Sequence, residues 1–184
     1  MRKEIEVKAK LNNPEEAESK LKALGCVLSE PIIQHDTIFV DDNYGIFDEF
    51  QPNKNLLRIR EAKGKFILTL KQPKSNELDS IEHESEIADP AEIKEILEHM
   101  GLHEVVQVHK VRRKTNYNDW EICLDQIEGL GAYIEIEKIA ENLDVEAVQK
   151  ELFEFLQSLG VKPEDRVTTG YDTLVYRGIN RRGV

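Results

Sequence analysis

Short runs in which charged and apolar residues alternate recur along the chain. The first reads EIEVK, so Glu4, Glu6 and Lys8 share one side of an extended strand while Ile5 and Val7 share the other. The same alternation returns in LLRIR, HESEI, KVRRK, EICLD and YIEIE. A period of two is typical of strands with one buried face, so these runs predict a sheet.

The order of the elements predicts how the strands pair. Strands are expected at residues 3–11, 34–42, 56–61, 65–72, 81–89, 105–117, 119–131 and 132–140. Helices are expected at residues 14–25, 90–101 and 144–160, since each begins at a Pro or a capping Asp and ends at a Gly. A short further element is expected at residues 170–177. Hairpin-like succession favours antiparallel pairing, because parallel strands need long crossovers. We therefore expect one α+β domain spanning residues 1–184.

Composition excludes several classes of protein. The net charge of −11 argues against an extended nucleic-acid surface, which needs a basic field. No apolar run approaches the roughly 18–20 residues that cross a bilayer, so no membrane association is expected. The N-terminal sequence MRKEIEVK has no apolar signal-peptide core, which predicts a cytoplasmic protein.

The charged faces of the strands allow two interpretations. A half-buried antiparallel sheet commonly exposes one polar face to water, and each strand taken alone fits that description. Here, however, the polar positions are almost all ionisable, and carboxylate pairs and cationic pairs lie on separate strands. If the three amphipathic helices cover the apolar sides, the charged sides face one another inside a closed barrel.

A charged interior needs ligands or partners, because buried charges are costly when unpaired. Carboxylate pairs suit the hard cations Mg²⁺ and Mn²⁺, which take oxygen ligands, and cationic pairs suit phosphate oxygens. The carboxylate pairs are Glu4 with Glu6 and Glu135 with Glu137, and the cationic pairs are Arg58 with Arg60 and Lys110 with Arg112. Divalent metals and a polyphosphate in one lumen would neutralise both sets.

A set of motifs along about the whole chain occurs in the same order as in a known protein family. After EIEVK come Arg58 and Arg60, an LTL strand that ends at Lys71, the pair in HESEI, KVR at residues 110–112, LDQIEGLG, YIEIE and GYDTL. This set resembles the CYTH superfamily of triphosphate tunnel metalloenzymes, and is most similar to the class IV adenylyl cyclase (CyaB-like) branch. The sequence departs from the family at Ile38, where an aromatic residue is usual.

The resemblance implies a closed antiparallel eight-stranded barrel with about three flanking helices, in which acidic residues bind Mg²⁺ or Mn²⁺ and basic residues hold a triphosphate. The implied metal ligands are Glu4, Glu6, Glu84, Glu86, Glu135 and Glu137. The implied triphosphate donors are Lys8, Arg58, Arg60, Lys71, Lys110 and Arg112. The catalytic residues are expected to be Lys8, Lys71 and Asp125. Asp125 has an alternative role as a salt-bridge partner within the lumen.

Three functions remain open at this point. The first is cyclisation of ATP to cyclic AMP and pyrophosphate. The second is hydrolysis of inorganic triphosphate, a nucleoside triphosphate or thiamine triphosphate. The third is binding of phosphorylated ligands without turnover. The resemblance also allows a homodimer.

His99 and His103 have the spacing of a helical metal pair, but Gly101 lies between them at a helix end, so no zinc site is expected there.

Overall fold

The computed structural model describes residues 3–140 and 143–182, so the expected domain limits at residues 1 and 184 lie outside the described residues. Its strands are β1 (Lys3–Lys10), β2 (Ile32–Asp41), β3 (Leu56–Ala62), β4 (Lys65–Pro73), β5 (Asp79–Ile87), β6 (Leu102–Tyr117), β7 (Trp120–Ile127), β8 (Gly131–Ala140) and β9 (Arg166–Val167). Its α-helices are α1 (Pro14–Ala23), α2 (Pro90–His99), α3 (Val145–Ser158) and α4 (Tyr171–Arg182). No helix in these ranges is long and apolar enough to span a membrane.

Eight strands close into a barrel. Hydrogen bonding runs in the order β5-β4-β3-β2-β6-β7-β8-β1, and β1 also pairs with β5, which joins the two edges. Every one of these pairings is antiparallel, as the hairpin order predicts. The short strand β9 adds to β1 near Lys8 and Ala9. The predicted α+β fold with a closed antiparallel barrel is confirmed.

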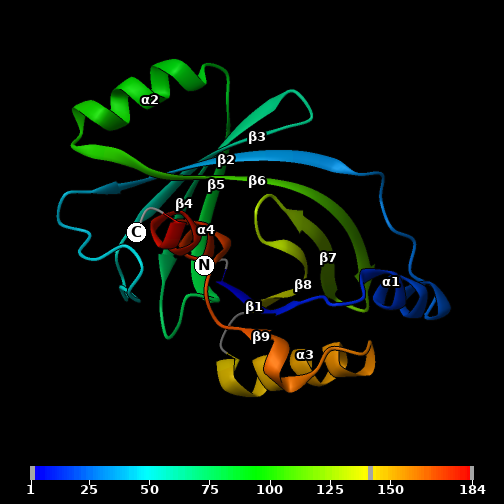
Figure 1. Ribbon diagram of the computed structural model, residues 1–184. Coiled ribbons are helices and arrows are strands. Elements are labelled where there is room, and N and C mark those ends of the chain that lie inside the picture. The colour runs from blue at the N-terminus through cyan, green and yellow to red at the C-terminus, as the bar shows by residue number, and fades with distance from the viewer. Residues whose placement is uncertain (1–2, 141–142, 183–184) are drawn as a thin grey trace.

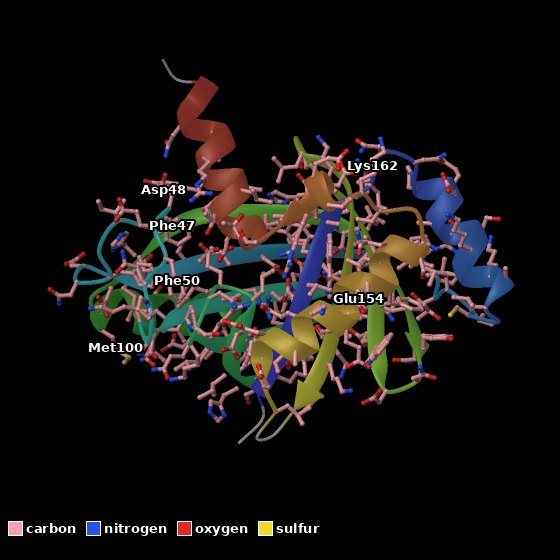
Figure 2. All side chains as sticks on the ribbon, turned by 90° about the horizontal axis from the view of Figure 1, so that it is seen from below. Phe47, Asp48, Phe50, Met100, Glu154 and Lys162 are labelled. Atoms are coloured by element: carbon pink, nitrogen blue, oxygen red, sulfur yellow. The ribbon has the colours of Figure 1, made fainter. Side chains whose placement is uncertain are left out.

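Helices α1, α2 and α3 lie outside the barrel and cover apolar sides of its strands. α3 begins at its cap Asp144, whose side chain accepts backbone N–H bonds, and it crosses β1 (Figures 1 and 2). Leu152 and Leu156 of α3 share one fully buried core cluster with Ile5 and Val7 of β1. Since those apolar residues face α3, the charged residues that alternate with them face the interior of the barrel.

A second cluster covers the opposite side. Leu97 of α2 packs with Phe39 of β2 and Ile59 of β3, and Figure 1 shows α2 above this part of the wall. α2 begins at Pro90 after its cap Asp89, whose carboxylate accepts two backbone N–H bonds. Because α2 and α3 pack on the outer faces of the strands, the polar faces of these strands point into the barrel.

The C-terminal segment forms a fourth helix, which is longer than the short element expected at residues 170–177. α4 packs against β6, and in Figure 1 it lies within the arc made by β6 above and β1 below. Its C-terminal part contacts the loop after β2, where the ring of Tyr176 lies 5.0 Å from that of Phe47. Arg177 donates a hydrogen bond to the backbone oxygen of Asp48, and Figure 2 shows Phe47 and Asp48 beside this helix. The first residues of α4, Tyr171 and Asp172, line the interior of the barrel.

Candidate active site

The barrel encloses a charged cavity of about 190 Å³. Its wall brings together most of the residues expected from the sequence. Those residues are Glu4, Glu6, Lys8, Arg58, Arg60, Lys71, Glu84, Lys110, Arg112, Glu135 and Glu137. The charged faces therefore line a lumen, and the interpretation as a solvated outer face is wrong for these strands.

Lys8 lies at the centre of the acidic wall. Its side chain is only 2% exposed, and its Nζ lies 3.0 Å from Glu6 Oε1 and 3.0 Å from Glu135 Oε1. Burial alone would lower the pKa of Lys8, but the two carboxylates outweigh burial and raise that pKa. The ammonium is therefore charged at neutral pH and is held in one position.

The two carboxylates beside Lys8 differ in their surroundings. Arg112 and Lys8 hold the pKa of Glu135 well below its usual range, although burial opposes them. Burial dominates at Glu6 and, together with the charge of Glu135, raises its pKa despite Lys8. Protein cations thus hold Glu135 in its ionised form, whereas burial favours a proton on Glu6, which a bound metal ion would replace.

Arg112 joins the acidic wall to α4. Its Nε donates to Asp125 Oδ1 at 2.7 Å, its Nη2 contacts Asp125 Oδ2 and Glu135, and the Tyr171 hydroxyl donates to Asp125 Oδ2 at 3.0 Å. Asp125 is buried and lies outside the set that lines the cavity. This position favours its alternative role, in which it orients the guanidinium of Arg112 by a bidentate salt bridge.

A second bidentate pair lies across the barrel. Arg60 Nε and Nη2 each donate to Asp36 at 2.7 Å, and the Arg60 guanidinium holds the pKa of Asp36 well below its usual range against the effect of burial. The neighbouring Arg58 donates to Glu84 Oε1 at 3.3 Å. Its Nε is buried and has no hydrogen-bond partner among the described residues.

Lys71 and Glu82 form a third pair on β4 and β5. Their charged atoms lie 3.1 Å apart, and the side chain of Glu82 is 8% exposed. Burial would raise the pKa of Glu82, but Lys71 and Arg58 lower it to about 2. Burial likewise opposes Lys71, whose pKa is raised by Glu82 and Glu6. Both groups are therefore ionised across the neutral range.

A group of carboxylates gathers on β1, β8 and β7. Glu137 lies opposite Glu6 on one side and opposite Glu121 on the other. Burial raises the pKa of Glu137 to about 8, and the charges of Glu4, Glu121 and Glu6 add to the increase. Such an oxygen-rich group matches the ligand chemistry of Mg²⁺ and Mn²⁺. Among the described residues no three acidic, His or Cys side chains converge as a formed metal site, so binding would require side-chain rotation and water ligands.

Lys110 differs from the other lumen cations. It is 6% exposed, and among the described residues its ammonium has no carboxylate within salt-bridge distance. Its contact is with the ring of Tyr171, whose centroid lies 5.0 Å from Nζ, while Lys8 lies 4.0 Å from the same centroid. Burial, followed by the charges of Arg112 and Arg60, lowers the pKa of Lys110 to about 8. A buried cation in this position calls for an anion from outside the protein.

The match to known families agrees with this geometry. A model described as the CYTH domain matches residues 2–171. The chain belongs to the CYTH family. Members of this family with the tunnel fold are generally dependent on divalent metals.

Similar proteins cover nearly the same length. A Methanocaldococcus jannaschii protein named as a candidate adenylate cyclase is 30% identical over 96% of this chain and 99% of its own. The solved structure of the PH1819 protein from Pyrococcus horikoshii is 28% identical, with a TM-score of 0.78 over 95% of this chain and 98% of that one. A Hippeastrum protein shares the fold at 22% identity and a TM-score of 0.62, covering 96% of this chain and 95% of its own.

One of the expected metal ligands lies away from the CYTH tunnel. Glu86 is 60% exposed, and its carboxylate lies 2.7 Å from Lys65 Nζ near the β3–β4 turn. It shares the strand face of Glu84, but it lies two residues further along β5, beyond the cavity. The alternation along a strand predicts on which side of the sheet a side chain lies. It does not predict whether that side chain lies within the cavity or beyond its end, as Glu86 does.

Several charged residues of the CYTH tunnel are not among the site residues that the sequence predicts. They are Asp36, Glu82, Lys114, Glu121 and Asp172. Glu82, Lys114 and Glu121 each stand two or four residues from an expected site residue on the same strand, so their phase could have identified them. Asp36 was detectable only through its register opposite Arg60, and Asp172 only through the position of α4.

Proposed function

We propose that this CYTH domain is a divalent-metal-dependent enzyme that cleaves triphosphates in its tunnel. The first reaction proposed is the class IV adenylyl cyclase type, in which ATP gives cyclic AMP and pyrophosphate. Similarity to the Methanocaldococcus jannaschii protein, named as a candidate adenylate cyclase, supports this choice.

The observation that carries the proposal is the set of unfilled donors in the tunnel. Lys110 is a buried ammonium without a carboxylate partner among the described residues, and Arg58 Nε is a buried donor without an acceptor. They stand on β6 and β3, whereas the nearby Arg60 and Arg112 are each already paired with a carboxylate, that of Asp36 and that of Asp125. A polyphosphate chain would supply acceptor oxygens and negative charge to such donors.

The proposed roles follow from these surroundings. Phosphate oxygens would be held by Lys8, Arg58, Arg60, Lys71, Lys110 and Arg112. Oxygen ligands for the metal would come from Glu4, Glu6, Glu84 and Glu137, with Glu135 contributing less because it already neutralises Lys8 and Arg112. A bound Mg²⁺ or Mn²⁺ would offset charge that develops on the phosphate oxygens.

In cyclisation, the ribose 3′-hydroxyl attacks the α-phosphorus and the bond to the β-phosphate oxygen breaks, which releases pyrophosphate. Lys8 and Lys71 keep their protons at neutral pH, because neighbouring carboxylates raise their pKa values. They would therefore act as fixed positive charges toward the phosphates. Asp125 would act as a positioning residue that holds Arg112 in place.

Hydrolysis is the second candidate. The cavity wall is mostly charged, and the one aromatic ring that the described residues contribute to it, that of Tyr171, already faces Lys8 and Lys110. The lining thus favours recognition of the phosphate chain over stacking of a base. The Hippeastrum protein, called a candidate adenylyl cyclase, is described as having a dominant triphosphatase activity, so both reactions have been linked to this fold.

A turnover assay tests the proposal. ATP, GTP, inorganic triphosphate and thiamine triphosphate are each incubated with the protein and Mg²⁺ or Mn²⁺, and the products are separated. Cyclic AMP with pyrophosphate supports cyclisation, whereas orthophosphate release supports hydrolysis. Tight binding of triphosphates without turnover would leave only a non-catalytic binder and would overturn the proposal.

Matched variants separate site effects from folding. Glu6→Gln is expected to abolish metal-dependent turnover and to leave the fold intact, because Glu135 still neutralises Lys8. Lys110→Met is expected to weaken triphosphate binding about tenfold or more, since it removes one charge-assisted contact. Glu86→Gln is the control, because this exposed carboxylate lies outside the cavity. Unchanged turnover in Glu6→Gln would contradict the metal-site assignment.

A further inference from the structure

Two histidines meet on the outer wall of the barrel, away from the tunnel. His35 of β2 lies directly opposite His109 of β6, and their ring centroids are 4.7 Å apart. His35 is exposed and His109 is half-buried. Neither imidazole has a hydrogen bond or ion pair with another described residue. The four ring nitrogens are therefore free to bind a ligand.

The separation of the rings matches that of two imidazoles bound to one metal ion. An ion held about 2.1 Å from one nitrogen of each ring lies about 3.2 Å from each ring centroid, so bond angles of about 90–110° place the centroids about 4.5–5.2 Å apart. The measured 4.7 Å falls within that range. Rotation about χ2 leaves each ring centroid in place, so the rings can turn a nitrogen toward one ion at this separation with the two strands left in place.

A groove beside the pair offers room for further ligands. It has a volume of about 480 Å³ and is lined by both histidines, by Gln126 and Glu128, and by the turn between β7 and β8. The Glu128 backbone N–H donates to the His109 carbonyl at 2.9 Å, which fixes this turn next to the pair. No third His, Cys, Asp or Glu completes a metal site in the described ranges, so water or a rotated Glu128 would fill the remaining positions.

We propose that His35 and His109 form a second metal site, which takes an imidazole-binding transition ion of the Zn²⁺ or Ni²⁺ class. Imidazole nitrogen favours these ions, whereas the tunnel carboxylates favour Mg²⁺ and Mn²⁺. Because strand residues alternate, the adjacent Asp36 and Lys110 point into the tunnel. An ion on the outer wall would tie β2 to β6 immediately behind these two groups.

Calorimetric titration of the intact protein with Ni²⁺ tests this site. Excess Mg²⁺ is present throughout to occupy the tunnel carboxylates. One Ni²⁺ per chain is expected to bind. His35→Ala and His109→Ala are each expected to weaken that binding at least about tenfold, since each removes one of two protein ligands. His99→Ala is the matched control, because His99 lies at the end of α2 and contacts the Glu95 carbonyl.

A second readout locates the ion. Paramagnetic Ni²⁺ is expected to broaden the ring C–H resonances of His35 and His109 and to leave those of His99 sharp. Both variants change outward-facing side chains, so folding is expected to be retained and is checked by circular dichroism. Failure of the wild-type protein to bind Ni²⁺ would overturn the proposal. Binding of equal affinity in the double variant His35→Ala/His109→Ala would also overturn it.

Discussion

The carboxyl of Glu137 predicts an unusual dependence of stability on pH. Its pKa is raised from 4.5 to about 8, first by burial and then by Glu4, Glu121 and Glu6. Between these two values the folded state holds a proton that the unfolded state has released. The stabilisation from the protonated carboxyl is therefore complete below about pH 4.5, and is lost as the pH rises to about 8.

The size of the effect follows from the same two values. A difference of about 3.5 pKa units, at about 1.4 kcal/mol for each unit, gives at most about 5 kcal/mol. Without divalent metal, the free energy of unfolding should therefore fall by up to this amount from this group alone. Added Mg²⁺ should restore stability at pH 8, because the metal replaces the proton among the carboxylates.

Glu137→Gln isolates this contribution. The amide has nearly the same shape and does not titrate, so the variant should gain stability relative to the wild-type protein by about 1.4 kcal/mol per pH unit between about pH 5 and pH 8. Urea denaturation of both proteins in a chelator over this range measures the difference. Glu86→Gln is the control, since its carboxylate is 60% exposed. Parallel curves for the wild-type protein and Glu137→Gln would refute the reasoning.

Two further changes test the wall and the core. Arg112→Met should destabilise the protein by about 3–5 kcal/mol, because it leaves the carboxylates of Asp125 and Glu135 buried without their guanidinium. A loss below about 1 kcal/mol in urea denaturation would contradict that pairing. Leu152→Ala should cost about 2–5 kcal/mol, since Leu152 is fully buried between α3 and β1. An unchanged melting temperature would mean that α3 contributes little to the barrel.

Much of the fold was predictable because its signals are local. The alternation in EIEVK and YIEIE gives the strand and its two faces, and the capping residues give three helices. α4 was underestimated because its sequence, YDTLVYRGINRR, contains Gly178 and has a weak apolar pattern. Contacts of Tyr176 and Arg177 with the loop after β2 stabilise this helix, and no local signal reports them.

The period-two pattern of the strands does not predict which charged residues pair within the tunnel. Arg112 contacts Glu135, which stands on a strand that is not its neighbour in the sheet. Asp36 neutralises Arg60 through the register between β2 and β3. The sequence of a single strand predicts which of its residues face the lumen. It does not predict their charged partners, because register and barrel closure are properties of the whole sheet. Lys110 stands out as unpaired only when all of those partners are known.

The position of β1 in the barrel has a consequence for the order in which the protein folds. β1 precedes the other described strands in the chain, yet its main partner, β8, begins at Gly131, and its other barrel partner, β5, begins at Asp79. During synthesis, β1 can therefore pair on both sides only after more than half of the chain has been made. Contacts so distant in sequence slow folding. The ring is complete only when β1 pairs with both β8 and β5, so metal or phosphate ligands that need the whole tunnel would stabilise the finished barrel.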